Sequence, residues 1–182
     1  MQTRMRIITA FAVVLLILIS GSGCGRIGES NLMVGVKDFK DPDAAMEYAG
    51  FSIRQPKDTL GGMLIFAEAS NNIIVNSVAL IYSNGLTFYA ELRPEPIDFK
   101  GRIASMEELS RQAQVKPTKL PYLFDVAGHQ GMIWPPHMNA GDKVPGTAAI
   151  YWWDSGVEYR VHGSDKGFTE EKALQVANSA YR

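Results

Sequence analysis

The sequence is poor in the features that would cross-link a domain or indicate a catalysed reaction. It has a single cysteine, Cys24, among 182 residues, so no disulfide can form within the chain. Gly-x-Ser-x-Gly, HExxH and P-loop patterns are absent, as are internal repeats and low-complexity segments. A hydrolase or transferase therefore has little support, and we predict a non-enzyme with no catalytic residues, no cofactor and no metal.

The charge balance excludes two kinds of partner. The leader described below contains two of the 18 basic residues, so the remaining chain has 16 basic and 19 acidic residues and a net charge of −3. No basic stripe is present, so binding to nucleic acid has no electrostatic support. The same holds for attraction to anionic lipid surfaces.

Basic, apolar and small residues follow one another at the N-terminus. Arg4 and Arg6 precede a run over residues 7–19 that is apolar apart from Thr9, and four small residues, 20–23, lead to Cys24. The run has 13 residues, whereas a membrane-spanning helix needs about 20. This order predicts a secretory signal peptide over residues 1–23.

The residues before Cys24 resemble the lipobox of bacterial lipoproteins. Ser22 and Gly23 fit that pattern, and Gly21 stands where the family usually has Leu. The resemblance implies cleavage before Cys24, attachment of acyl chains such as palmitate, and a lipid anchor in the cell membrane or the outer membrane. Residues 24–41 are then a lipidated tether. Simple secretion and an uncleaved anchor remain the alternatives.

Residues 42–182 show strand and helix signals without βαβ alternation. Helices are expected over residues 44–48, from Ser105 to about Gln114 on the capping box that starts at Ser105, and at the C-terminus after the N-cap Thr169. Asn84-Gly85 predicts a type I′ β-hairpin. Further strands are expected over residues 51–54, 60–69, 123–126, 131–134, 147–153 and 157–162. The fold class is α+β: one domain with a curved antiparallel β-sheet covered on one face by two or three helices.

Several segments of this domain are similar to a bacterial extracytoplasmic domain of unknown function. They are Ala49-Gly50-Phe51-Ser52-Ile53, Gly128-His129-Gln130-Gly131, Ala149-Ile150-Tyr151-Trp152-Trp153, residues 156–163 and the helix ending at residues 176–179. That domain occurs in envelope lipoproteins and on the outer side of anti-sigma-factor-like proteins. It is distantly akin to carriers of the outer-membrane lipoprotein-sorting type. The resemblance implies no catalytic residues.

Aromatic side chains concentrate in the C-terminal half. Because Trp152 and Trp153 are consecutive on a strand, they must point to opposite faces of the sheet. We expect both to pack between sheet and helices, whereas an exposed Trp would indicate a binding surface. The loop Pro135–Gly146 is the expected rim for a ligand or partner. The candidate partner or ligand surface is Trp134, His137, Met138 and Trp153.

Together these features favour a membrane-anchored cell-envelope lipoprotein that acts as a binding or regulatory module for an unknown envelope protein or peptide. An alternative is a carrier that holds a lipid or acyl chain between sheet and helices, with Leu86, Phe88, Trp152 and the final helix lining the cavity. A third is a metal-assisted hydrolase around His129 and His137, with Met138 or Asp142 as a third ligand. For these histidines, surface loop positions are the simpler interpretation.

Overall fold

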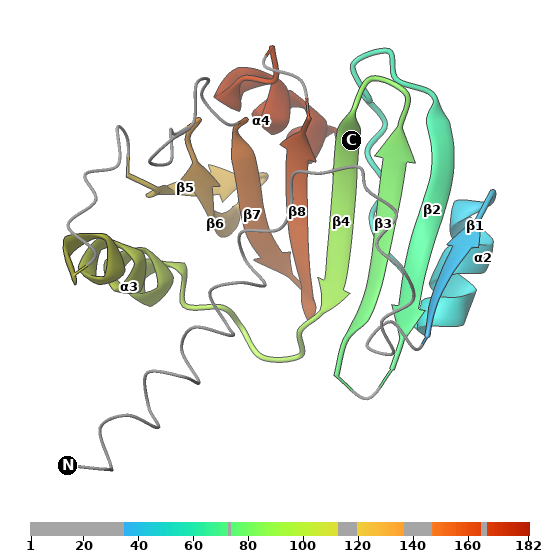
Figure 1. Ribbon diagram of the computed structural model, residues 1–182, viewed down its shortest axis with the longest axis horizontal. Helices are drawn as coiled ribbons and strands as arrows, with labels where there is room; N and C mark the ends of the chain where they lie inside the picture. The colour runs from blue at the N-terminus through green and yellow to red at the C-terminus, as the bar shows by residue number, and fades with distance from the viewer. Residues whose placement is uncertain (1–34, 73, 113–119, 137–146, 165–166) are drawn as a thin grey trace. The chain divides into compact units, whose positions relative to one another are not determined.

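The computed structural model describes residues 35–72, 74–112, 120–136, 147–164 and 167–182. Within these ranges, eight strands form one antiparallel sheet accompanied by three helices (Figure 1). The predicted α+β class, with its curved antiparallel sheet, is confirmed. The helices are α2 (Pro42–Ala49), α3 (Phe99–Gln112) and α4 (Glu170–Ser179). The strands are β1 (Val36–Phe39), β2 (Leu64–Asn71), β3 (Asn76–Tyr82), β4 (Leu86–Leu92), β5 (Tyr122–Val126), β6 (His129–Trp134), β7 (Ala149–Asp154) and β8 (Val157–Gly163).

The sheet consists of two meanders that meet in its middle. Its strand order is β1-β2-β3-β4-β8-β7-β6-β5, so each half of the described chain forms four consecutive neighbouring strands. The halves join where β4 pairs with β8, from Leu86 opposite Gly163 to Leu92 opposite Val157. Since the sheet does not close, β1 and β5 are its two edges.

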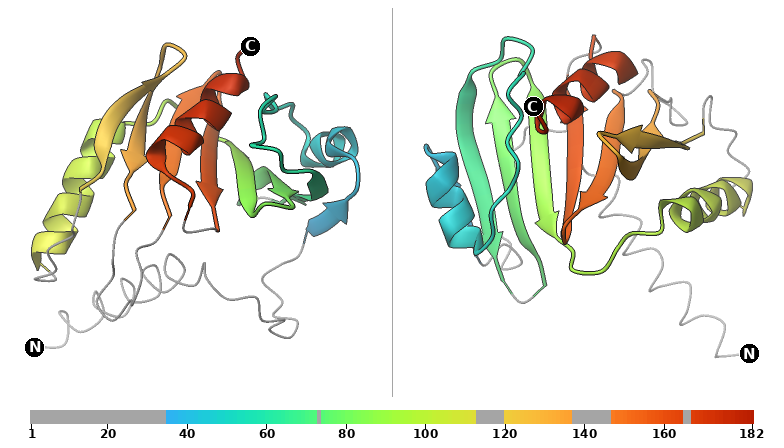
Figure 2. Two further views of the ribbon diagram at one scale, coloured as in Figure 1. Left: turned by 90° about the horizontal axis from the view of Figure 1, so that it is seen from above. Right: turned by 180° about the vertical axis from the view of Figure 1, so that it is seen from behind.

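Helices α2 and α4 pack on one face of the sheet, here called the helix face (Figure 2). Alternate residues of the central strands point to this face and are buried, among them Phe88, Trp152 and Val161. Small residues let the helices approach closely: α2 buries Ala45 and Ala49, and α4 buries Ala173, Val176 and Ala177. The predicted N-cap of α4 is confirmed, because the side chain of Thr169 accepts a hydrogen bond from the backbone N–H of Lys172.

Helix α3 is associated with the opposite face, here called the α3 face. Arg102 of α3 forms an ion pair with Glu158 of β8. Val157 and Tyr159, on either side of Glu158, point to the helix face, so Glu158 points to the α3 face. The capping-box prediction for this helix is wrong, since α3 begins six residues before Ser105. Its first turn is capped by Asp98, whose carboxylate accepts from Gly101 N–H at 2.9 Å, and Ser105 Oγ donates to the carbonyl of Gly101.

The predicted strand over residues 51–54 is not a strand. This segment packs onto the helix face instead, where Arg54 N–H donates to the hydroxyl of Tyr159 and Phe51 and Ile53 contact the core. Its alternation of apolar and polar residues therefore reflects one side packed on the core and the other in solvent. An irregular segment with one buried side produces the same local pattern as a half-buried strand.

The hairpin predicted at Asn84-Gly85 is present, but its turn is of another type. Of these two residues only Gly85 has a positive φ, at 76°, and its N–H donates to Tyr82 C=O at 3.0 Å. A three-residue loop therefore joins β3 to β4. Two consecutive positive φ angles, as in a type I′ turn, occur instead at Ala127-Gly128 and at Ser155-Gly156.

The sheet begins within the range predicted as tether, because β1 pairs with β2 from Val36 onward. The predicted signal peptide and Cys24 lie outside the described residues. None of the helices in the described ranges combines the length and apolar content that crossing a bilayer requires.

Candidate functional site

Two of the four residues of the predicted partner surface are described, and both lie on the α3 face. Trp134 of β6 is opposite Ala149, and Trp153 of β7 is opposite Glu158. This register places the two tryptophans at opposite ends of their strands, so they share a face without being neighbours. His137 and Met138 lie outside the described residues.

The adjacent tryptophans of β7 have different environments. Trp152 is fully buried on the helix face, stacks on Tyr159 with ring centroids 5.1 Å apart, and donates its indole N–H to Tyr181 Oη at 2.8 Å. Trp153 is only partly buried on the α3 face, where its indole N–H donates to the carbonyl of Arg93. The expected opposite orientation is confirmed. The expectation that both pack between sheet and helices is wrong for Trp153.

Beside Trp153, two carboxylates meet across neighbouring strands. Glu91 of β4 lies opposite Glu158 of β8, a pairing of like charges that is unfavourable by itself. Arg93 binds Glu91 at 2.6 Å, and Arg102 binds Glu158 at 2.5 Å, so each carboxylate has its own guanidinium. Burial raises the pKa of Glu91, and the nearby Arg93 opposes that shift. The arginines thus neutralise an acidic pair and attach the start of α3 to the sheet.

The middle of the α3 face combines a cation with aromatic rings. Arg160 of β8 lies between Tyr89 and Tyr151 in the cross-strand register, with its guanidinium carbon 5.5 Å from the Tyr151 ring centre. Its buried Nε has no hydrogen-bond partner among the described residues. Burial, with a smaller effect of Arg160, lowers the pKa of the nearby His162 to about 4, so His162 is neutral at pH 7.

A second polar cluster, on the helix face, was not anticipated from the sequence. The buried carboxylate of Asp154 accepts from Arg54 Nε at 2.9 Å, from Ser155 Oγ at 2.7 Å and from Tyr181 Oη at 3.2 Å. His129 Nδ1 lies 3.6 Å from the same carboxylate and its ring stacks on that of Tyr181. Apart from Ser155, the partners come from positions far apart in the chain, so no short motif could have revealed the cluster.

The hydrogen bonds of this cluster connect separate segments of the chain. The hydroxyl of Ser155 donates to Asp154, whereas a nucleophilic serine would be paired with a base such as His129. Asp154 instead joins the segment that contains Arg54, the β7–β8 turn and the C-terminal Tyr181. Over the described part of the chain, no group of three or more His, Cys, Asp or Glu side chains could hold a metal ion.

Leu86, Phe88 and Trp152, the residues proposed to line a carrier cavity, line neither of two surface depressions of the described domain. One, of about 410 Å³, is lined by Asp43, Met46, Glu47, Gly50, Phe51 and Ser52; the other, of about 100 Å³, is lined by Val36, Glu68, Ala69, Ser70, Ser77, Ala79 and Tyr89. Leu86, Phe88 and Trp152 are at most 1% exposed. Phe88 packs edge-on against Trp152 with centroids 6.0 Å apart, which leaves no space for an acyl chain between these two rings.

Comparison of the chain with protein-family models, with curated proteins and with solved structures finds no match. The case for function therefore depends on the residues and their geometry.

Replacement of Asp154 with asparagine is expected to lower the free energy of unfolding by about 2 kcal/mol at pH 7, because several donors lose a charged acceptor. Burial by itself raises the pKa of Asp154, but hydrogen bonds from Ser155 and Arg54 outweigh that effect and the pKa lies below 3.8. A lowered folded-state pKa stabilises the protein above pH 3.8, and this stabilisation is lost as the pH falls through the folded-state value.

Urea unfolding at pH 7 and pH 3 measures this effect. The difference between wild type and Asp154→Asn should be smaller at pH 3. Asp38→Asn, at an exposed position of β1, is the matched control and should change stability little at either pH. An equal loss for both variants would contradict a specific role for the Asp154 cluster.

Proposed function

We propose that this protein is a lipid-anchored cell-envelope protein whose domain binds a protein or peptide partner and catalyses no reaction. The N-terminal order of basic, apolar and small residues before Cys24 supports export and lipidation. The lipid on Cys24 would hold the domain at the extracytoplasmic surface of the cell membrane or the outer membrane. No nucleic acid and no cofactor takes part.

The observation that carries the binding proposal is the composition of the α3 face around Trp153. Trp153, Tyr151 and Arg160 are partly exposed there, although the adjacent Trp152 is fully buried. Trp, Tyr and Arg are the residue types most enriched where protein partners bind tightly. The Arg160 guanidinium lies over the Tyr151 ring and the Trp153 indole is hydrogen-bonded to Arg93, so two of these side chains are held in place before a partner arrives.

Site-specific photo-crosslinking in intact cells of the organism that makes this protein tests this proposal. A photoreactive amino acid at position 153 of the full-length protein should give a discrete crosslinked species after illumination. The matched control has the same amino acid at Glu171, which is exposed on α4 at the helix face, and should give no such species. Identical crosslinking patterns from both positions, or none from position 153, would count against a partner surface on the α3 face.

A further inference from the structure

The two edges of the sheet differ in how well they are protected against pairing with another strand. β1 has only four residues and carries the charged, exposed Lys37 and Asp38, which are features that discourage pairing with another strand. β5 and the second residue before it expose three large apolar side chains: Leu120 at 44%, Tyr122 at 42% and Leu123 at 41%. An exposed apolar edge strand without lysine is a ready template for a further strand.

The backbone of β5 shows what would bind there. The positive φ angles of Ala127 and Gly128 indicate a two-residue turn, so the flanking Val126 and His129 exchange hydrogen bonds with each other. Because bonded and non-bonded pairs alternate, Leu123 and Asp125 direct their N–H and C=O groups away from β6. No described residue pairs with β5 on that side. Leu123 and Asp125 thus each present an outward N–H and C=O. Their spacing of two residues matches the spacing of the hydrogen-bonding groups along one side of an extended polypeptide.

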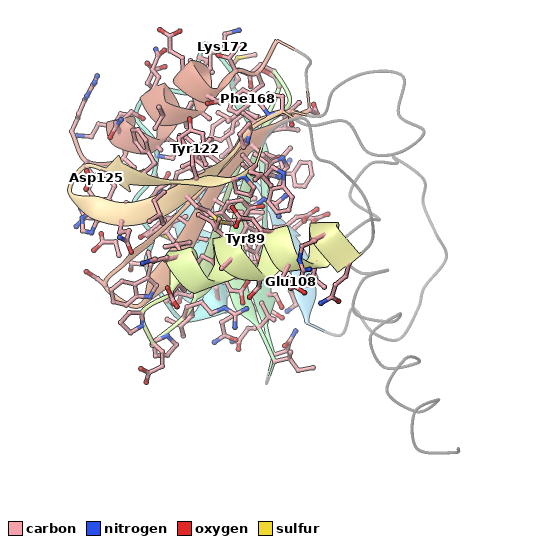
Figure 3. All side chains as sticks on the ribbon, turned by 90° about the vertical axis from the view of Figure 1, so that its left-hand side faces the viewer. Tyr89, Glu108, Tyr122, Asp125, Phe168 and Lys172 are labelled. Carbon is pink, nitrogen blue, oxygen red and sulfur yellow. The ribbon has the colours of Figure 1, made fainter. Side chains whose placement is uncertain are left out.

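The side chains around the edge define the character of that polypeptide. Leu123 points to the α3 face, where Leu109 of α3 is also 50% exposed, so this side offers apolar contact. β5 and β6 contain Asp125 and no lysine or arginine, and Glu170 at the start of α4 accepts from Tyr122 Oη. Figure 3 looks onto this edge, with Tyr122 and Asp125 labelled, α4 above and α3 below.

We propose that β5 accepts an extended segment of a partner polypeptide as a ninth strand, with an apolar residue opposite Leu123 and a basic residue opposite Asp125. A second copy of this chain fits the edge less well. Symmetric antiparallel pairing that uses the same outward groups places Leu123 opposite the partner's Asp125, an apolar side chain against a carboxylate. Strand β6 lies between this edge and Trp153 of β7, and the inference rests on the outward backbone groups of β5, so it does not depend on the proposed function.

Binding of a labelled synthetic peptide to the full-length protein in detergent tests the inference. The probe is a heptapeptide that alternates valine and lysine, and fluorescence anisotropy measures its Kd. Methylation of alternate backbone nitrogens of the probe removes strand pairing without altering the protein and should weaken binding at least about tenfold. Replacement of the lysines of the probe with glutamates should weaken binding as well, because Asp125 and Glu170 then repel it.

Two protein variants locate the site. Leu123→Pro removes one outward N–H while it leaves the ladder to β6 intact, and should also weaken binding at least about tenfold. Trp153→Ala, in β7 beyond the intervening strand β6, should leave the Kd unchanged. Absence of peptide binding, equal affinity for the methylated probe, or loss of binding in Trp153→Ala alone would overturn the proposal. So would dimerisation of the free protein that Leu123→Pro abolishes, since the occupant would then be a second copy.

Discussion

Replacement of Trp152 with alanine is expected to lower the free energy of unfolding by about 4 kcal/mol. The side chain is fully buried, stacks on Tyr159, meets Phe88 edge-on and donates its indole N–H to Tyr181. The substitution removes these contacts and leaves a large cavity in the centre of the helix face. Such a loss is a large share of the total stability of a small domain, so the variant should be only marginally folded at 37 °C.

The adjacent residue supplies the matched control. Trp153→Ala removes an indole of the same size from the same strand, but this side chain is partly exposed and makes one hydrogen bond, to Arg93. It should cost about 1 kcal/mol. Urea unfolding followed by far-UV circular dichroism measures both variants without dependence on tryptophan fluorescence. Similar losses at the two positions would contradict the assignment of Trp152 to the core and Trp153 to a surface.

Replacement of Cys24 with alanine is expected to move the protein from the membrane fraction to the soluble fraction of cells. None of the helices in the described ranges can span a bilayer, and the chain after the predicted leader has a net charge of −3, so the proposed attachment rests on the lipid at Cys24. Acyl chains on Cys24 would supply the binding free energy, at about 0.8 kcal/mol for each buried CH₂ group.

Fractionation of cells and mass spectrometry of the mature N-terminus measure this effect. Gly25→Ala is the control and should remain lipidated and in the membrane fraction. A Cys24→Ala protein that stays in the membrane with residues 1–23 still attached would favour the uncleaved anchor. A wild-type protein that is already soluble, with an unmodified N-terminus, would favour simple secretion.

Local signals in the sequence predicted several elements because the interactions that form them are local. The β3–β4 hairpin follows from two apolar segments separated by Asn84-Gly85, and the N-cap of α4 needs only Thr169 and the three residues after it. The same kind of reasoning failed at Ser105. A capping-box pattern occurs there inside a helix that starts earlier, at a cap that Asp98 provides. Local patterns identify the type of an element better than its first residue.

Contacts between distant segments decided what local patterns could not. The sequence by itself determined that Trp152 and Trp153 point to opposite faces, because side chains alternate along a strand. Only the tertiary structure decided which of them is buried, since that depends on the face that α4 and the segment around Arg54 cover. The Asp154 cluster likewise unites residues 54, 129, 154 and 181. The Arg54–Asp154 contact links the two halves of the chain, which are joined in the sheet where β4 pairs with β8.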